Sequence, residues 1–399
     1  MTRPCVLHLA VEYPSRNRDT NTPAVRNFIQ ANSQADYRVF ALRRTAKPWH
    51  CNALTGDDQG DTNVTSMKYW GLPYGLLLFL SMTIVAWRIR QQIQQEGTAI
   101  IAVHGHKFTF EGIAAWWLAR WLQVPLLLSV RGEAEQKVLR YKPHYRPFFK
   151  KQLTEAKRVY LVSAWFQGEL NELYPNPSNQ RLLPNFVAER PWQPSHHWQP
   201  NKLVTVMDLN VLHKKGLPNL LAAIAKIRHS YPKISLDIYG SGTMRSQQQA
   251  QQLIAAQKLQ PHVQLQGALP NRQLLKKLPH YAGLVLTSHN ETFGMVYVEA
   301  MLSGIPVIYS QHTGIDGFVD GLHGCTGTNP DDIETISHSI SSLLTHQQQW
   351  RHWLQAHHQL VVQRFDRKYY INEYNQMLAS CLPRDTAAFP ATAQGSVKE

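Results

Sequence analysis

The chain has 399 residues, 43% hydrophobic and 17% charged, which excludes a fibrous or wholly disordered protein and is enough for two domains with full cores. Its net charge of +14 is uneven: residues 1–190 hold 24 basic and 14 acidic residues, a net of +10. So basic an N-terminal half indicates an anionic partner, which is a membrane surface, a phosphorylated acceptor or a nucleic acid.

Cysteine spacing and hydropathy bear on the compartment of the protein and on whether the chain crosses a membrane. The four cysteines form no C-x-x-C pair and no zinc-type spacing with histidine, so we expect free thiols in a reducing compartment: Cys5, Cys51, Cys325 and Cys381. The apolar run at 5–11 is too short for a signal peptide and predicts a first strand. The most apolar stretch, 72–87, has about 16 residues where a membrane span needs ~20, so we predict a buried or interfacial helix.

The first half of the chain alternates short apolar runs with helical periodicity. Strands are predicted at 5–11, 37–42, 98–103, 126–130 and 159–163. Helices are predicted at 25–33, 72–95 and 111–122. Residues 12–24 form a polar loop, and 43–68 look polar and irregular. This alternation predicts a parallel sheet covered by helices on both faces.

A basic segment follows at 137–158. It holds eight Lys or Arg and one acidic residue, interleaved with Tyr141, Tyr145, Phe148 and Phe149. Basic and aromatic side chains together suit an anionic membrane interface, and a solvated basic helix face is the alternative.

Prolines at 191, 194 and 200 mark a linker, 191–201, before a second strand–helix series. Strands are predicted at 203–207, 234–239 and 263–266, and helices at 217–229, 246–259 and 271–278. We therefore predict an N-terminal domain over 1–190, a C-terminal domain over 202–350, a helical region over 351–382 that crosses back to the first domain, and a disordered tail over 383–399.

The stretch 281–310 is the most informative. A buried strand at 284–286 leads through polar residues to a helix that stops at Gly304, before another strand at 307–309. Glu291 and Glu299 stand near the strand's carboxyl end, where such folds bind ligands, and helical rise would separate them by on the order of 10 Å. That distance suits the sugar and ribose of a sugar nucleotide, and two surface glutamates near a helix start are the alternative.

These residues together resemble glycosyltransferase family 4, the retaining sugar-nucleotide transferases of GT-B fold, and its bacterial envelope and exopolysaccharide members in particular. The most specific piece is an E-x7-E element within SHNETFGMVYVEAMLSGIPVI at 288–308. Lys215-Gly216, the glycine turn at 239–242 and His104-Gly105-His106 also match, so the resemblance covers about residues 5–380. It implies an α/β chain of two Rossmann-like domains facing across a cleft.

The resemblance also implies roles for the matching residues. Lys215 would neutralise the donor diphosphate, Glu291 would hold the donor sugar, and His106 would lie near the transferred sugar as the third catalytic residue. Further donor-binding positions would be Glu299 on the ribose, the backbone at Phe293, Gly294 and Met295, and Gly240, Asn210 and Lys214. Acceptor-binding positions would be His104, Arg131 and Glu12. No general base, cofactor or divalent metal is implied.

Three departures from the family pattern stand out. Where an Arg usually precedes the conserved Lys by five or six residues, this chain has Asn210 and Leu209. Arg131 stands where many members have the His of His-Gly-x-Asp, so the basic group is kept without titration near neutrality. The loop 12–24 offers Asn21-Thr22-Pro23 in place of a phosphate-approaching glycine.

The leading hypothesis is a transferase that moves a sugar from a UDP- or GDP-sugar to a lipid-linked, lipopolysaccharide or polysaccharide acceptor. We expect it to be cytoplasmic, on the inner face of the cytoplasmic membrane, with an anionic membrane surface as partner and no nucleic acid. The alternatives are a non-catalytic glycan- or partner-binding protein and a sugar-nucleotide epimerase. A dinucleotide oxidoreductase is disfavoured because GSG at 240–242 lacks the third glycine of G-x-G-x-x-G.

Overall fold

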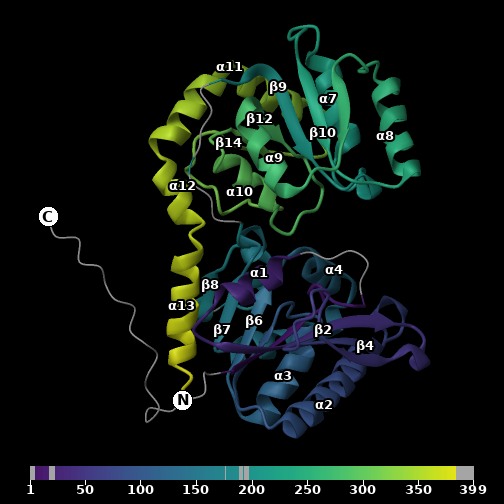
Figure 1. Ribbon diagram of the computed structural model, residues 1–399, viewed down its shortest axis with the longest axis vertical. Helices are drawn as coiled ribbons and strands as arrows, with labels where there is room; N and C mark the ends of the chain where they lie inside the picture. The colour runs from purple at the N-terminus through teal and green to yellow at the C-terminus, as the bar shows by residue number, and fades with distance from the viewer. Residues whose placement is uncertain (1–4, 18–22, 176, 188–191, 193–196, 383–399) are drawn as a thin grey trace, which may run out of the picture. The chain divides into compact units, whose positions relative to one another are not determined.

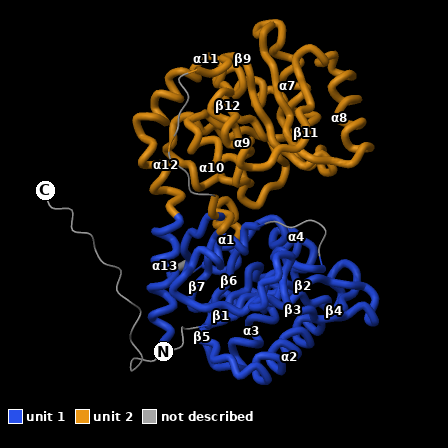
Figure 2. The backbone as a smooth tube through the Cα atoms, in the orientation of Figure 1, with its two compact units in different colours: residues 1–161, 170–185, 367–399 blue, residues 162–169, 186–366 orange. Residues whose placement is uncertain are grey.

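A computed structural model of the chain describes residues 5–17, 23–175, 177–187, 192 and 197–382. The described residues form two compact units, each built on its own sheet (Figure 1). Unit 1 comprises residues 1–161, 170–185 and 367–399, and unit 2 comprises 162–169 and 186–366 (Figure 2). The helix at the end of the described chain, α13 (Arg367–Ala379), therefore belongs to the N-terminal unit.

Unit 1 holds an eight-stranded sheet in the order β3-β4-β2-β1-β5-β6-β7-β8. Its strands are β1 (Cys5–Ala10), β2 (Asp36–Thr45), β3 (Asn52–Thr55), β4 (Val64–Trp70), β5 (Ile100–Gly105), β6 (Leu126–Val130), β7 (Arg158–Leu161) and β8 (Gln180–Leu182). Only β3 runs antiparallel to its neighbour, among the pairs that the described residues form. Every residue of β1 and β6 is buried, as expected for central strands covered on both faces.

The helices of unit 1 connect these strands. They are α1 (Ala24–Ala31), α2 (Leu78–Glu96), α3 (Glu111–Leu122), α4 (Glu133–Tyr141) and α5 (Arg146–Glu155), and α6 (Gln167–Leu173) joins the two units in sequence. Figure 1 shows α2 and α3 side by side, and their residues are in contact. None of the described helices combines the length and hydropathy that crossing a bilayer requires.

Two predictions about elements were wrong. Residues 43–68 are not irregular: they contain β3 and β4, at the edge of the sheet, where β3 exposes all four of its residues and so carries no apolar signal. The helix predicted from residue 72 begins only at Leu78, because a 3₁₀ turn, η2 (Pro73–Gly75), precedes it.

Unit 2 holds a six-stranded parallel sheet in the order β11-β10-β9-β12-β13-β14. Its strands are β9 (Gln199–Val206), β10 (Ser235–Tyr239), β11 (Val263–Gly267), β12 (Tyr281–Val285), β13 (Val307–Ser310) and β14 (Cys325–Thr328). Its helices are α7 (Leu217–Ile227), α8 (Met244–Ala256), α9 (Asn271–Lys277), α10 (Met295–Met301), α11 (Ile333–Ala356) and α12 (His358–Arg364). The predicted α/β architecture with two parallel sheets is confirmed.

The boundaries of the C-terminal half differ from the prediction. The predicted boundary at residue 350 falls inside α11, which begins at Ile333. Asp332 marks the start of this helix by accepting hydrogen bonds from the backbone N–H of Glu334 and Thr335. Five residues of the predicted linker 191–201, namely 191 and 193–196, lie outside the described residues, and its last three residues begin β9. The predicted disordered tail, 383–399, and the Asn21-Thr22 departure also lie outside them.

Candidate active site

The strand order of unit 2 reverses between β9 and β12. The chain runs from β9 to β10 on one side, and β12 returns to the other side of β9. Parallel sheets bind ligands beyond the carboxyl ends of their strands at such a point. Lys215 comes from the connection that follows β9, and Glu291 from the loop that follows β12, so both predicted residues reach this point.

The structure brings Lys215 and Glu291 together as an ion pair from Nζ to Oε2. Their side chains are 18% and 17% exposed, so solvent and ligand can reach both groups. The backbone of Glu291 is fixed in turn: its N–H donates to Thr313 Oγ1 at 2.6 Å, and its carbonyl accepts from Gly314 N–H at 2.9 Å. Thr313 and Gly314 thus hold the glutamate in place.

Two glycines shape this edge. At Gly216 φ is +73°, and a Cβ would stand 1.9 Å from the carbonyl oxygen of Thr287. At Gly240, one of the predicted donor-binding positions, a Cβ would stand 1.7 Å from the carbonyl oxygen of Met207. Only glycine permits these backbone approaches, which bring the connection after β9 against its neighbours.

Glu299 lies in α10 and is 8% exposed, with Oε1 accepting a hydrogen bond from Asn271 Nδ2 at 2.8 Å. The two glutamates are not on one helix as predicted, because α10 begins only at Met295, after Gly294 at φ +76°. Glu291 is therefore in the preceding loop. The Phe293 side chain is fully buried against Phe318, at 5.3 Å between ring centroids, so only its backbone can meet a ligand.

Asn210 and Lys214 have different surroundings. Asn210 Oδ1 accepts hydrogen bonds from the backbone N–H of Thr243 at 2.9 Å and from Ser246 Oγ at 3.0 Å, which ties the connection after β9 to the start of α8. The Lys214 side chain is exposed, while its backbone carbonyl accepts from His289 N–H. The residue that replaces the usual Arg therefore already has a structural role, and the donor-binding role of Asn210 stays a prediction.

Several buried polar atoms near this edge find no partner in the described part of the chain. Four of them, at or just beyond the ends of β12 and β13, have no hydrogen-bond partner among the described residues: Thr287 Oγ1, Ser288 Oγ, Asn290 Oδ1 and Ser310 Oγ. Buried polar atoms in folded proteins are nearly always paired. Their concentration at the ligand-binding edge indicates a site that a polar ligand or its waters complete.

Unit 1 has a comparable reversal between β1 and β5, and three histidines meet there. His8 pairs in register with His104, and His8 Nδ1 lies 3.1 Å from His106 Nε2. The rings of His104 and His106 stack at 4.3 Å between centroids. Burial lowers the pKa of His8 to about 3 and the pKa of the other two well below the usual value, so all three are neutral at pH 7.

The predicted acceptor-binding His104 is enclosed by protein partners. Its Nδ1 lies 3.0 Å from Tyr374 Oη and its Nε2 lies 2.8 Å from Ser129 Oγ, so both ring nitrogens are satisfied. His106 is 1% exposed. This geometry favours structural positioning over direct contact with a substrate for His104. Sequence reasoning missed His8, because a lone histidine in an apolar run gives no sign of which strand it will pair with.

Charged residues gather at the carboxyl ends of the same strands. Arg131 is 4% exposed, and its Nε donates to the carbonyl of His106 at 3.2 Å. Glu12 accepts from Lys107 Nζ at 2.5 Å. Glu111 accepts from Val11 N–H at 3.2 Å, and burial raises its pKa to about 8.

This charged cluster contains two residues that were predicted to bind the acceptor, Arg131 and Glu12. It also contains three that the sequence analysis did not identify, which are Lys107, Glu111 and Glu135. The third of these, Glu135, is fully buried, accepts from Arg131 N–H, and has its pKa raised by burial. Two features of the sequence could have identified them: Lys107 directly follows the H-x-H motif, and Glu111 is the first residue of the next helix.

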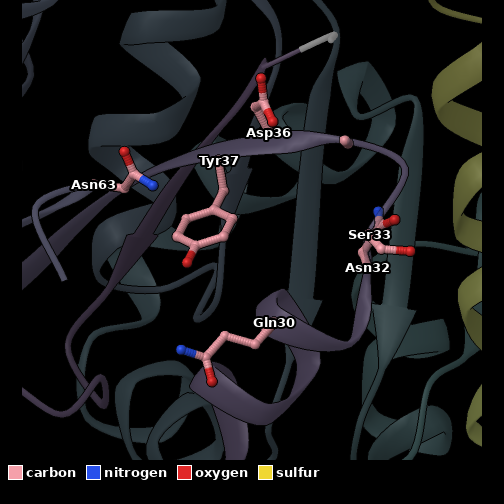
Figure 3. Close-up of a pocket in the computed structure, with 7 residues that line it drawn as sticks. Gln30, Asn32, Ser33, Asp36, Tyr37 and Asn63 are labelled. Atoms are coloured by element: carbon pink, nitrogen blue, oxygen red, sulfur yellow. The ribbon is translucent and has the colours of Figure 1, made fainter. Parts of the chain in front are cut away.

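A separate polar pocket of about 250 Å³ lies in unit 1 at the amino end of β2 (Figure 3). Its lining includes Gln30, Asn32, Asp36, Tyr37 and Asn63. The Tyr37 ring extends towards Gln30 in Figure 3, and its hydroxyl donates to Asp61 at 2.7 Å. Ligands of parallel sheets bind at the opposite, carboxyl ends, so this pocket is not part of the candidate site.

Comparisons with known proteins agree with this geometry. The family model described as "Glycosyl transferase 4-like domain" matches residues 22–185, and the one described as "Glycosyl transferases group 1" matches residues 189–360. The chain belongs to the family 4 type of glycosyltransferases. A glycogen synthase of Mycobacterium tuberculosis is 27% identical over 205 residues, which are 48% of this chain and 46% of that protein. The chain thus spans about half the length of that relative.

Solved structures share the whole fold of this glycosyltransferase. Anabaena HepE in complex with UDP and glucose superposes with a TM-score of 0.66 at 15% identity, covering 95% of this chain and 100% of that one. The apo lipopolysaccharide outer core galactosyltransferase WaaB gives 0.68 at 15% identity, with the same coverage. At this identity the likeness shows the fold, GT-B with two Rossmann-like domains. The predicted family and fold are confirmed.

Proposed function

We propose that this glycosyltransferase moves a sugar from a UDP- or GDP-sugar, with retention of anomeric configuration, to a lipid-linked, lipopolysaccharide or polysaccharide acceptor. The observation that carries the proposal is the meeting of Lys215 and Glu291 at the carboxyl edge of the unit 2 sheet, where buried polar atoms have no partner among the described residues. The UDP and glucose bound to HepE and the lipopolysaccharide named for WaaB support a UDP-sugar and an envelope glycan.

The chemistry follows from these groups. Binding of the donor diphosphate replaces Glu291 as the partner of Lys215 and frees the carboxylate for the hydroxyls of the donor sugar. As the bond from the anomeric carbon to the diphosphate breaks, Lys215 stabilises the charge that develops on the leaving oxygen. The acceptor oxygen bonds to the anomeric carbon on the same face, and its proton passes to the departing diphosphate. Glu299 holds the ribose through the transfer.

Lys215 supplies the positive charge that a divalent metal gives other sugar transferases, so we propose that the reaction needs neither metal nor cofactor. We also propose that the enzyme works peripherally at the inner face of the cytoplasmic membrane. The excess of basic residues in 1–190 supports an anionic membrane surface as its partner.

A donor panel tests the proposal. The full chain is incubated with UDP- and GDP-sugars and with envelope glycolipid acceptors in the presence of EDTA, and product configuration is read by NMR. Transfer with retention from one donor is expected. If no nucleotide sugar binds, the chain has a non-catalytic, glycan-binding role instead. A product of inverted anomeric configuration would rule out the retaining mechanism.

A further inference from the structure

A row of apolar side chains on the surface of unit 1 is left exposed by the residues that the structure describes. Within fourteen residues, six large apolar side chains are exposed: Tyr74, Leu76, Leu77, Leu80, Ile84 and Trp87. We refer to them as the apolar ridge. Leu80, Ile84 and Trp87 are spaced along one face of α2, while Met82, Val85 and Ile89 bury the other face in the core.

The backbone under the ridge is strained. Tyr74 has φ +55° and Leu77 has φ +53°, a left-handed conformation that bulky residues adopt at a cost. Their side chains are 92% and 54% exposed, so packing within unit 1 does not offset the strain. The turn instead directs two apolar side chains into solvent, which is the arrangement of a surface that is buried only on binding.

Basic side chains border the ridge. Lys142 Nζ donates to the carbonyl of Gly75 at 2.6 Å, and the Phe79 ring packs edge-on against Phe148 at 5.0 Å, so the basic segment 137–158 lies against the start of α2. Arg88, Arg140, Arg146 and Lys150 are exposed. In contrast, the sequence has no acidic residue between 62 and 95 or between 136 and 154.

We propose that the apolar ridge inserts into an anionic phospholipid bilayer while the basic side chains bind lipid headgroups. Apolar burial and headgroup attraction together are what hold a peripheral protein at a bilayer. A second copy of the chain fits less well, because two such basic borders would repel each other. The inference extends the membrane partner in the proposed function, and assigns it to α2 and the preceding turn rather than to the basic segment alone.

Vesicle co-sedimentation of the full chain, without donor or acceptor, tests this directly. Phosphatidylcholine vesicles with and without 30 mol% phosphatidylglycerol, about typical of an anionic leaflet, serve as probes. Tyr74→Gly/Leu77→Gly removes two ridge side chains at positions where glycine is unstrained. We expect its Tm to be unchanged or higher, while its partition into anionic vesicles falls at least tenfold. Arg88→Gln/Lys150→Gln should lower the partition about fivefold per charge removed and weaken its salt dependence.

Matched controls lie in unit 2. Leu360→Ser/Val362→Ser removes two exposed apolar side chains, and Lys233→Gln/Arg245→Gln removes two exposed charges; neither should change vesicle binding. The UDP-induced thermal shift of the same samples reports the donor site separately. Equal binding to neutral vesicles, or full binding by the glycine variant, would overturn the inference. So would self-association in sedimentation velocity that the glycine variant abolishes, since the ridge would then be a contact between copies.

Discussion

At the scale of single residues, the ion pair of Lys215 and Glu291 is the feature with the most direct consequence for chemistry. Both side chains are mostly buried, at 18% and 17% exposed, so removing one partner alone leaves the other charge without its partner and lowers stability. The same lysine would carry most of the leaving-group stabilisation, so it contributes to the transition state as well as to the fold.

We expect Lys215→Ala to lower kcat by about 10²–10³, because a single charged donor to a developing oxyanion contributes on that scale. Steady-state transfer rates measure the effect, and the exposed Lys233→Ala controls for loss of a charge in the same unit. A Lys215→Ala enzyme with normal kcat would show that another group stabilises the diphosphate.

Burial of the Glu111 carboxyl makes the stability of unit 1 depend on pH. Its pKa is about 8 in the folded unit, against 4.5 ordinarily, because the carboxyl is buried. Between these pH values the folded chain binds more protons than the unfolded chain, so the free energy of unfolding falls as pH rises from about 4.5 to 8. We expect Glu111→Gln to remove this decline and to be more stable than the parent at pH 8, by on the order of a few kcal/mol at most.

Denaturant midpoints of unit 1 at pH 5 and pH 8 measure this difference, with the exposed Glu172→Gln as the matched loss of a carboxyl. An unchanged pH dependence in Glu111→Gln would contradict a buried, neutral carboxyl at this position.

At the scale of elements, the position of Lys215 depends on the glycine that follows it, Gly216, in the connection after β9. A Cβ at Gly216 would meet the Thr287 carbonyl at 1.9 Å, whereas Gly267 has nearly the same φ, +74°, with nothing within 4 Å of its Cβ. Both substitutions to alanine carry the left-handed strain, and only Gly216→Ala adds the clash.

We therefore expect Gly216→Ala to destabilise unit 2 by about 2 kcal/mol or more beyond Gly267→Ala, and to weaken donor binding because Lys215 is displaced. Thermal unfolding and nucleotide titration of both variants measure this. Equal stability of the two variants would mean that the loop relaxes without difficulty.

Elements were predictable where periodicity was strong. The wholly buried β6 and the helix α3 were placed to the residue, because a short apolar run and helical spacing are visible in the sequence itself. The edge strand β3 was missed since its residues are all exposed. The start of α10 depended on the left-handed Gly294, and for this reason the prediction that Glu291 and Glu299 share one helix was wrong.

At the scale of the whole molecule, the family and the two parallel sheets followed from motifs that are contiguous in sequence. The buried groups of unit 1 did not, because His8, Lys107 and Glu111 come from segments about a hundred residues apart that meet only when β1 pairs with β5. Their roles depend on pairing and burial, which one sequence does not display. For unit 2, we propose that the carboxyl edge of its sheet binds a nucleotide-diphosphate sugar.

A thermal-shift titration with UDP, GDP and ADP, without added metal, tests that claim most directly. A nucleotide at a hundredfold excess over its Kd stabilises the folded state by ~2.7 kcal/mol. Glu299→Gln can keep the hydrogen bond from Asn271 while it loses the charge that binds the ribose hydroxyls. We expect one nucleotide to raise the Tm of the parent and the shift to shrink strongly in Glu299→Gln and Lys215→Ala. A shift of equal size in both variants, or none with any nucleotide, would contradict it.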